Sequence, residues 1–162
     1  MLPKWHALLG LIFSVLLVML FNISFFSATV VFLAAVFIDI DHYLFYVYKT
    51  GDWNLKKSVS WYFKNADLFE KMSQKERRKI YAGLCFLHGI EAIIVLLILS
   101  FLFKQWSVLF LSIICGFIFH QLLDAIDLYR ERYDFDKVVS FIYSLKNSKN
   151  KKLLQEIKDG RK

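Results

Sequence analysis

Residues 106–129 read WSVLFLSIICGFIFHQLLDAIDLY, and this stretch decides the fold class. It carries no Asp, Glu, Lys or Arg before Asp124, so it supplies the roughly 20 apolar residues that a membrane-spanning helix needs. Its last part is different, because His120, Asp124 and Asp127 follow one another at spacings of four and three residues. These spacings place the three polar side chains on one face of a helix. The stretch therefore predicts a membrane span with a polar face near one end.

Three further apolar stretches have the composition of membrane spans, and they cover about residues 7–21, 25–48 and 80–103. Short polar connections, 22–24 and 104–105, join the four spans into two helical hairpins. Apolar residues make up 57% of the chain, more than is usual for a soluble domain. The sequence thus predicts an all-α integral membrane bundle of four transmembrane helices over residues 1–129, followed by a basic tail over 130–162.

Basic residues predict the orientation of this bundle. Of the 21 Lys and Arg, nine lie in segment 49–79 and ten in the tail, while Lys4 and Lys104 are the remaining two. Four spans place that segment, the tail and Lys4 on one side, which the positive-inside rule makes cytoplasmic. We therefore expect an inner-membrane protein with both termini in the cytoplasm. Basic segments beside membrane spans indicate contact with membrane lipids and their anionic headgroups, and not with nucleic acid.

Two polar segments carry an amphipathic pattern. In segment 49–79, Trp61, Tyr62 and Phe63 stand among lysines, and after Tyr133 apolar residues recur at helical spacing. Both patterns predict amphipathic helices that lie in the membrane interface, with simple packing as the alternative.

Polar residues inside the spans gather toward their predicted cytoplasmic ends. A charged side chain in hydrocarbon costs about 2.5–3.5 kcal/mol, so such residues usually have a function. With a rise of about 1.5 Å per residue, most of the set lies within about 15 Å of one interface. The set comprises all four histidines and five acidic residues: His6, Asp39, Asp41, His42, His88, Glu91, His120, Asp124 and Asp127.

Imidazole and carboxylate groups at i,i+3 and i,i+4 spacing are the usual ligands of zinc, manganese and iron. We expect a divalent metal, with zinc as the first candidate, and the predicted ligands are His6, Asp39, His42, His88, His120 and Asp124. Bound metal can activate water for hydrolysis, and a spare acid can then serve as the general base. Glu91 and Asp41 are the predicted catalytic residues, each a candidate for the general base, and Asp41 could instead orient a metal ligand.

The order of these residues is similar to that in the predicted membrane-bound metal-dependent hydrolases of the LexA-regulated inner-membrane type. Over residues 5–128 the chain carries an early histidine, an Asp-x-Asp-His element, a third histidine and a His-x-x-x-Asp-Ala element, namely His6, Asp39 to His42, His88 and His120 to Ala125. The resemblance implies a membrane-embedded metal-dependent hydrolase.

The expected function is hydrolysis of a lipid phosphoester or phosphodiester at the cytoplasmic face of the membrane. Three alternatives remain open at this point. Intramembrane His and acidic residues also build ion or metal pathways, and carboxylate and His ligands in a four-helix bundle suit a di-iron oxidoreductase. The cluster could also serve only helix assembly in a non-catalytic membrane scaffold.

Overall fold

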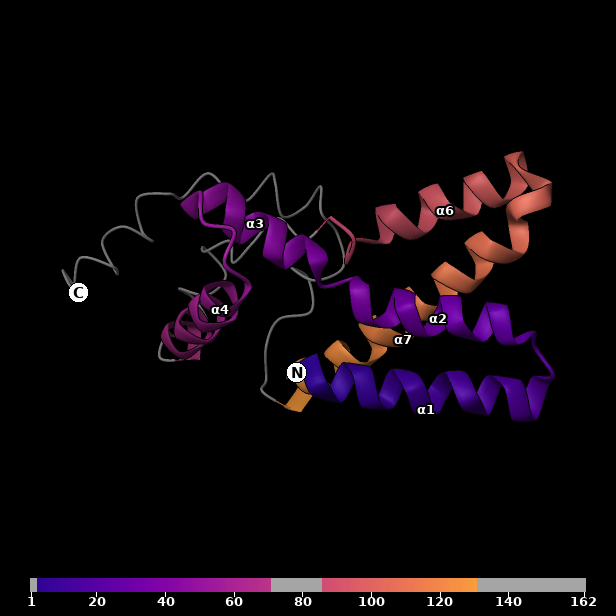
Figure 1. Cartoon of the computed structure of the whole chain (residues 1–162), viewed down its shortest axis with the longest axis horizontal. Helices are drawn as coiled ribbons and strands as arrows, with labels where there is room; N and C mark the ends of the chain where they lie inside the picture. Colours follow the sequence, from indigo (N-terminus) through magenta and orange to yellow (C-terminus); the bar gives the residue numbers. More distant parts are fainter. Residues whose placement is uncertain (1–2, 71–85, 131–162) are drawn as a thin grey trace.

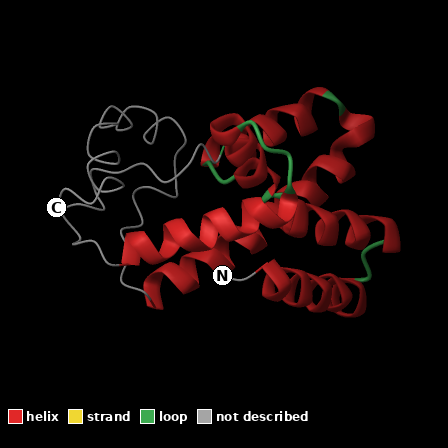
Figure 2. Cartoon of the chain, turned by 60° about the vertical axis from the view of Figure 1, so that its left-hand side comes forward, coloured by secondary structure: helices red, strands yellow, loops and turns green. Residues whose placement is uncertain are grey.

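The computed structural model describes residues 3–70 and 86–130, and every regular element in these ranges is a helix. The predicted all-α class is therefore confirmed. The helices are α1 (Pro3–Phe21), α2 (Phe25–Phe37), α3 (Ile40–Thr50), α4 (Leu55–Glu70), α6 (Ile90–Leu102), the 3-10 turn η1 (Lys104–Trp106) and α7 (Ser107–Arg130). Short loops join most of them, as Figure 2 shows. The predicted helix after Tyr133 lies outside the described residues.

Three helical stretches of the described chain are long and apolar enough to cross a membrane: Lys4–Phe21, Phe25–Thr50 and Lys104–Ile126. The fourth expected span is represented by α6, which is apolar but has only 13 residues. At about 1.5 Å per residue it covers less than the roughly 30 Å of the hydrocarbon core. The composition and the helix lengths thus make this a membrane protein with three candidate spans and a shorter apolar helix.

Helix α2 is the centre of the bundle, because it packs against both α1 and α7, while α6 packs against α7 (Figure 1). Small residues allow this. The face that α2 buries includes Ser27, Ala28, Ala34 and Ala35. A Cβ atom added to Gly116 of α7 would lie 2.5 Å from the carbonyl oxygen of Val31 and 2.7 Å from the Cβ of Ala34. The α2 and α7 backbones therefore approach as closely as small-residue interfaces in membranes allow.

Helix α2 ends before the apolar pattern does. The predicted span 25–48 is split, because α2 stops at Phe37 and α3 begins at Ile40. The last ladder bond runs from the Ile38 N–H to the Ala34 carbonyl at 3.2 Å. The next carbonyl, that of Ala35, instead accepts a hydrogen bond from His120 Nδ1 at 2.7 Å. A side chain inserted into the helical ladder in this way is a known cause of helix breaks.

The predicted span 80–103 also begins differently from expectation. Residues 80–85 lie outside the described part, and residues 86–89 are a non-helical bend that leads into α6 at Ile90. His88 therefore precedes the helix, whose N-cap is Gly89, while Glu91 lies in the first turn of the helix. A continuous helix over the predicted span 80–103 would place His88 and Glu91, three residues apart, on one face, but the chain bends at residues 86–89 and His88 lies outside the helix.

Helices α3 and α4 form a separate hairpin beside the bundle (Figure 1). Gly51 ends α3 with a left-handed φ of 71°, a conformation that glycine adopts without strain. The Asn54 side chain then accepts a hydrogen bond from the Lys57 N–H at 3.1 Å and so starts α4. The Lys57 ammonium bonds to Asp52 at 2.8 Å and holds the pKa of that carboxyl below its usual value. Segment 49–79 thus contains a helix, α4.

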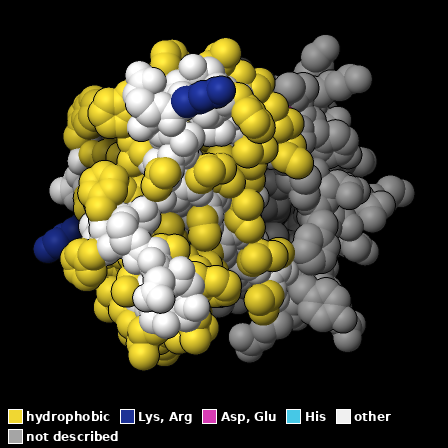
Figure 3. All heavy atoms as spheres, turned by 90° about the vertical axis from the view of Figure 1, so that its right-hand side faces the viewer, with side chains coloured by type: hydrophobic (Ala, Val, Ile, Leu, Met, Phe, Trp, Pro, Cys, Tyr) yellow, Lys and Arg dark blue, Asp and Glu magenta, His cyan; other side chains and the backbone are white. Residues whose placement is uncertain are grey.

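The end of the molecule that carries the connections 22–24 and 103–106 is apolar. Figure 3 shows it as mostly hydrophobic, with few Lys or Arg and no Asp, Glu or His visible among the described residues. Large apolar side chains such as Leu20, Phe25 and Phe101 are 70–82% exposed here and in the adjoining helix turns. Such exposure suits contact with lipid and contrasts with the opposite end of the bundle, where the polar residues gather.

Candidate metal centre

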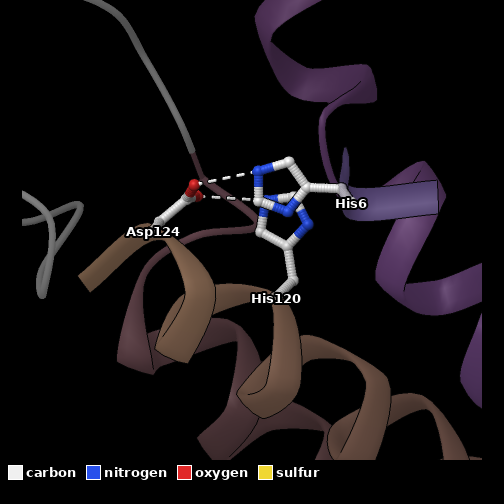
Figure 4. Close-up of side chains that lie close together, drawn as sticks. All are labelled: His6, His120 and Asp124. Atoms are coloured by element: carbon white, nitrogen blue, oxygen red, sulfur yellow. Dashed lines mark ion pairs between the residues drawn. The ribbon is translucent and has the colours of Figure 1, made fainter. Parts of the chain in front are cut away.

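The opposite end of the bundle brings together all four histidines and three aspartates of the predicted set. Three overlapping groups of these side chains could each hold a metal ion, since their ligand atoms lie within 4.8 Å of one another. The groups are His6, His120 and Asp124; Asp39, His88 and His120; and Asp41, His42 and His88. His6 comes from the start of α1, and His120 and Asp124 come from the end of α7 (Figure 4). Residues far apart in the sequence thus build one cluster.

Four ligand atoms surround the middle of this cluster. Asp39 Oδ1 lies 3.4 Å from His88 Nε2 and 3.5 Å from His120 Nε2. Asp124 Oδ2 lies 3.0 Å from His120 Nε2 and 3.8 Å from His88 Nε2. Ligand atoms about 2.0–2.2 Å from a shared tetrahedral zinc ion are roughly 3.3–3.5 Å from one another. The two distances from Asp39 Oδ1 fit edges of such a tetrahedron, whereas the two from Asp124 Oδ2 fall on either side of this range.

Two of the histidines are held by hydrogen bonds that fix which nitrogen is available. His120 Nδ1 donates to the Ala35 carbonyl, which can only accept, so in the neutral ring Nε2 is the electron-pair donor. His88 Nδ1 lies 3.0 Å from Asp41 Oδ2, and a carboxylate likewise accepts. Both rings therefore present Nε2 to the middle of the cluster. An imidazole held through its other nitrogen is the common arrangement of metal-binding histidines.

The Nε2 atoms of His88 and His120 are buried and lack a hydrogen bond of good geometry, and the nearest carboxylate oxygens lie 3.0–3.8 Å from them. A protonated Nε2 would point its hydrogen at one of those oxygens. If the nitrogen and the oxygen instead both bind one cation, they lie close together with no hydrogen bond between them. Since a buried polar atom without a partner is costly, this geometry suits a cation between them better than it suits simple ion pairs.

Asp124 extends the cluster toward α1. Its Oδ1 lies 3.1 Å from His6 Nε2, while its Oδ2 faces His120, so its two oxygens serve different histidines (Figure 4). The rings of His6 and His120 stack with centroids 4.1 Å apart. The His6 ring is buried. A carboxylate in this position could bridge two ions or orient His6.

His42 and Asp39 form the open side of the cluster. The side chain of His42 is 35% exposed and that of Asp39 is 32% exposed, whereas those of His88 and His120 are buried. His42 Nε2 lies 3.7 Å from Asp39 Oδ1. The Tyr62 hydroxyl of α4 donates to the His42 carbonyl at 2.7 Å, and the two rings meet edge-on.

The two predicted catalytic acids lie in different surroundings. Asp41 is fully buried, and its Oδ2 accepts hydrogen bonds from His88 Nδ1 and from the Leu87 N–H, each at 3.0 Å. It therefore orients His88. Glu91 is half-buried in the first turn of α6, and the three groups described above do not include it. The side chain of Asp127 lies outside the described part of the molecule.

Three contacts of the site could not be predicted by sequence reasoning. The Ala35 carbonyl and the Leu87 N–H are backbone groups, which every residue of their kind carries, so no sequence signal marks them. Tyr62 is recognisable in the sequence only as one aromatic residue of an amphipathic segment.

The hydrogen bond between Asp41 and His88 leads to a prediction. Replacing Asp41 by asparagine keeps the shape but turns an accepting oxygen into a possible donor, so the Nδ1–H of His88 loses its fixed acceptor. We expect metal affinity to fall about 10–100-fold, as for other lost partners of metal-binding histidines. Equilibrium metal titration of the purified protein measures this. Asp52→Asn, at an exposed aspartate, is the matched control and should bind metal as the wild type does; equal affinities in both variants would contradict the orienting role.

Comparisons with protein-family models, with curated proteins and with solved structures find nothing that matches this chain. The likeness to membrane-bound hydrolases therefore stays an expectation from short motifs, and the function is argued from the site itself.

Proposed function

We propose that this chain is a membrane-embedded metal-dependent hydrolase that acts at the cytoplasmic face on a lipid phosphoester or phosphodiester. The observation that carries the proposal is the convergence of two buried imidazole nitrogens, His88 Nε2 and His120 Nε2, on carboxylate oxygens of Asp39 and Asp124 at 3.0–3.8 Å. In this proposal α1, α2 continued by α3, the shorter α6, and α7 form the four predicted spans, and both termini are cytoplasmic.

Six of the predicted residues would hold metal. His88, His120, Asp39 and Asp124 would hold a divalent ion, zinc being the first candidate because it favours four nitrogen and oxygen ligands. His6, beside the second oxygen of Asp124, and His42, beside Asp39, would be the two remaining ligands. Such an ion supplies Lewis-acid activation of water and offsets the negative charge of a phosphoester.

The other residues would position and move protons. Asp41 is best suited to orienting His88, because both of its described hydrogen bonds serve that purpose and it has no exposed surface. We assign the general base to Glu91, which is near His88 in the chain and is half-buried. The exposed side chains of His42 and Asp39 mark the side from which a headgroup would enter.

Glu91→Gln separates catalysis from metal binding. We expect this variant to keep its metal and to lose turnover of a phosphoester or phosphodiester lipid about 10²–10⁴-fold, because a general base contributes that much. Asp39→Asn should lose both, since Asp39 faces two ligand nitrogens. The measurement is product release in proteoliposomes, with bound metal determined by elemental mass spectrometry. Full turnover in Glu91→Gln would remove Glu91 from the mechanism, and wild-type protein with metal but no turnover on any phosphoester lipid would contradict the hydrolase.

Metal handling without hydrolysis is the second candidate, since the same ligands would bind an ion to be moved. The described polar ligands gather at one end of the bundle, and the opposite end is apolar (Figure 3). An ion pathway needs polar residues through the full thickness of the membrane. This distribution favours a site that acts at one surface.

A further inference from the structure

The outward side of α4 combines an exposed apolar stripe with lysines. Leu55, Val59 and Phe63 recur at every fourth residue and are 63%, 41% and 50% exposed, respectively. This spacing puts them on one side of the helix, with Lys56 and Lys64 exposed on the neighbouring side. An exposed apolar stripe bordered by lysines is the pattern of a helix that lies in the plane of an anionic membrane surface.

The inward side of the same helix reaches the metal cluster. Ser58 is buried, and Trp61 packs edge-on against Phe45 and Tyr46 of α3, which fixes α4 against that helix. One helical turn after Ser58, Tyr62 donates its hydroxyl hydrogen to the His42 carbonyl at 2.7 Å. The two sides of α4 therefore have different partners, and one of these partners belongs to the open side of the cluster.

Other groups of the α3–α4 hairpin repeat this pattern. Lys49 lies over the rings of Phe45 and Tyr48, and Tyr48 and Trp53 are 76% and 70% exposed. Aromatic rings with lysines beside them are typical of the headgroup level of a bilayer. Charge also selects the partner, because lysines within reach of the stripe attract an anionic surface and would repel a basic one.

We propose that α4 binds an anionic phospholipid surface through Leu55, Val59 and Phe63, with Lys56 and Lys64 at the headgroups, and thereby presents those headgroups to His42 and Asp39. The substrate class is then an anionic phospholipid taken directly from the bilayer. This last step rests on the proposed hydrolase function, whereas the membrane contact does not. Tyr62 is a positioning residue, because it touches His42 and keeps α4 beside the open side of the cluster.

Fluorescent labelling tests the membrane contact without any turnover. In a variant with Cys85 and Cys115 replaced by alanine, Val59→Cys carries an environment-sensitive nitrobenzoxadiazole label, and Ser60→Cys carries it in the matched control. The proteins are reconstituted into vesicles of phosphatidylcholine alone or with an equal amount of phosphatidylglycerol. We expect the label at position 59 to shift its emission to the blue and to be quenched severalfold more strongly than the label at position 60 by nitroxide on the acyl chains. The difference should be larger in the anionic vesicles.

Charge reversal tests the lipid class. Lys56→Glu with Lys64→Glu should reduce the quenching at position 59 in anionic vesicles to its level in neutral ones. Each lysine near an anionic surface raises the affinity for that surface roughly fivefold. Equal quenching at positions 59 and 60 would overturn the proposal. So would a shielded label that acyl-chain nitroxide does not reach, because a second copy of the chain would then cover the stripe. Because the assay reports the position of the label and not the release of product, its failure is distinct from failure of the hydrolase proposal.

Discussion

Replacing His120 by alanine is expected to remove the bound metal from the purified protein. Its Nε2 lies 3.0 Å from Asp124 Oδ2 and 3.5 Å from Asp39 Oδ1, so it is close to two other proposed ligand atoms. Loss of a ligand should cost more than the roughly 10–100-fold that loss of a supporting hydrogen bond costs. Elemental mass spectrometry of untagged protein measures the metal per chain.

The control for this variant comes from the same helix. Ser112 is buried two turns earlier in α7, and its hydroxyl donates to the Val108 carbonyl at 2.7 Å within the helix. Ser112→Ala should therefore keep its metal. Asp39→Ala, from the other hairpin, should lose it as His120→Ala does. If wild-type protein holds no stoichiometric metal even after reconstitution, the metal centre is refuted and a proton-carrying or purely structural cluster takes its place.

The second large effect is expected at Gly116. A methyl group there would meet the backbone oxygen of Val31 at 2.5 Å, and a backbone atom inside a helix cannot move aside. Gly116→Ala should destabilise the bundle by about 1–3 kcal/mol, and Gly116→Val by more, because overpacking of a close helix contact has this cost. Thermal unfolding in detergent, followed by circular dichroism, measures the change.

Gly10 offers the matched control for this experiment. A Cβ atom at Gly10 would lie 3.5 Å from the Cβ of Ala35, which is an ordinary van der Waals contact. Both glycines lie inside helices, so each gains about 1 kcal/mol of helix propensity on replacement by alanine. Gly10→Ala should thus match or exceed the wild type in stability. Equal melting temperatures for Gly116→Ala and Gly10→Ala would show that α2 and α7 are not in close contact.

The helices and the location of the site could be predicted because they follow from periodicity. The spacing of His120 and Asp124 placed both on one face of a helix, and they lie together at 3.0 Å. Counting residues along the spans also placed the His and Asp ligands at one end of the bundle. These predictions needed only the rise of a helix and the cost of charges in hydrocarbon.

The points where the helices break could not be predicted in the same way. Residues 35–40 are apolar except for Asp39, so nothing in their composition ends α2 at Phe37. The break is associated with a tertiary contact, the hydrogen bond from His120 Nδ1 to the Ala35 carbonyl. His88 was assigned to a helix for the same reason, since the bend before Gly89 is not marked by proline or by a run of polar residues.

The cluster draws its ligands from two pairs of helices, α1 with α2 and α6 with α7, and from the residues next to them. This has a consequence for how the protein is made. His6 and Asp39 enter the membrane with the first pair of helices, whereas His88, His120 and Asp124 arrive later with the second pair. Neither pair alone contains the four proposed ligands of the central ion. Capture of the proposed ion by all four ligands would therefore follow insertion and docking of the second pair. Until then, the aspartates of each pair would lack the histidines that the other pair supplies, such as His120 beside Asp39 and His6 beside Asp124.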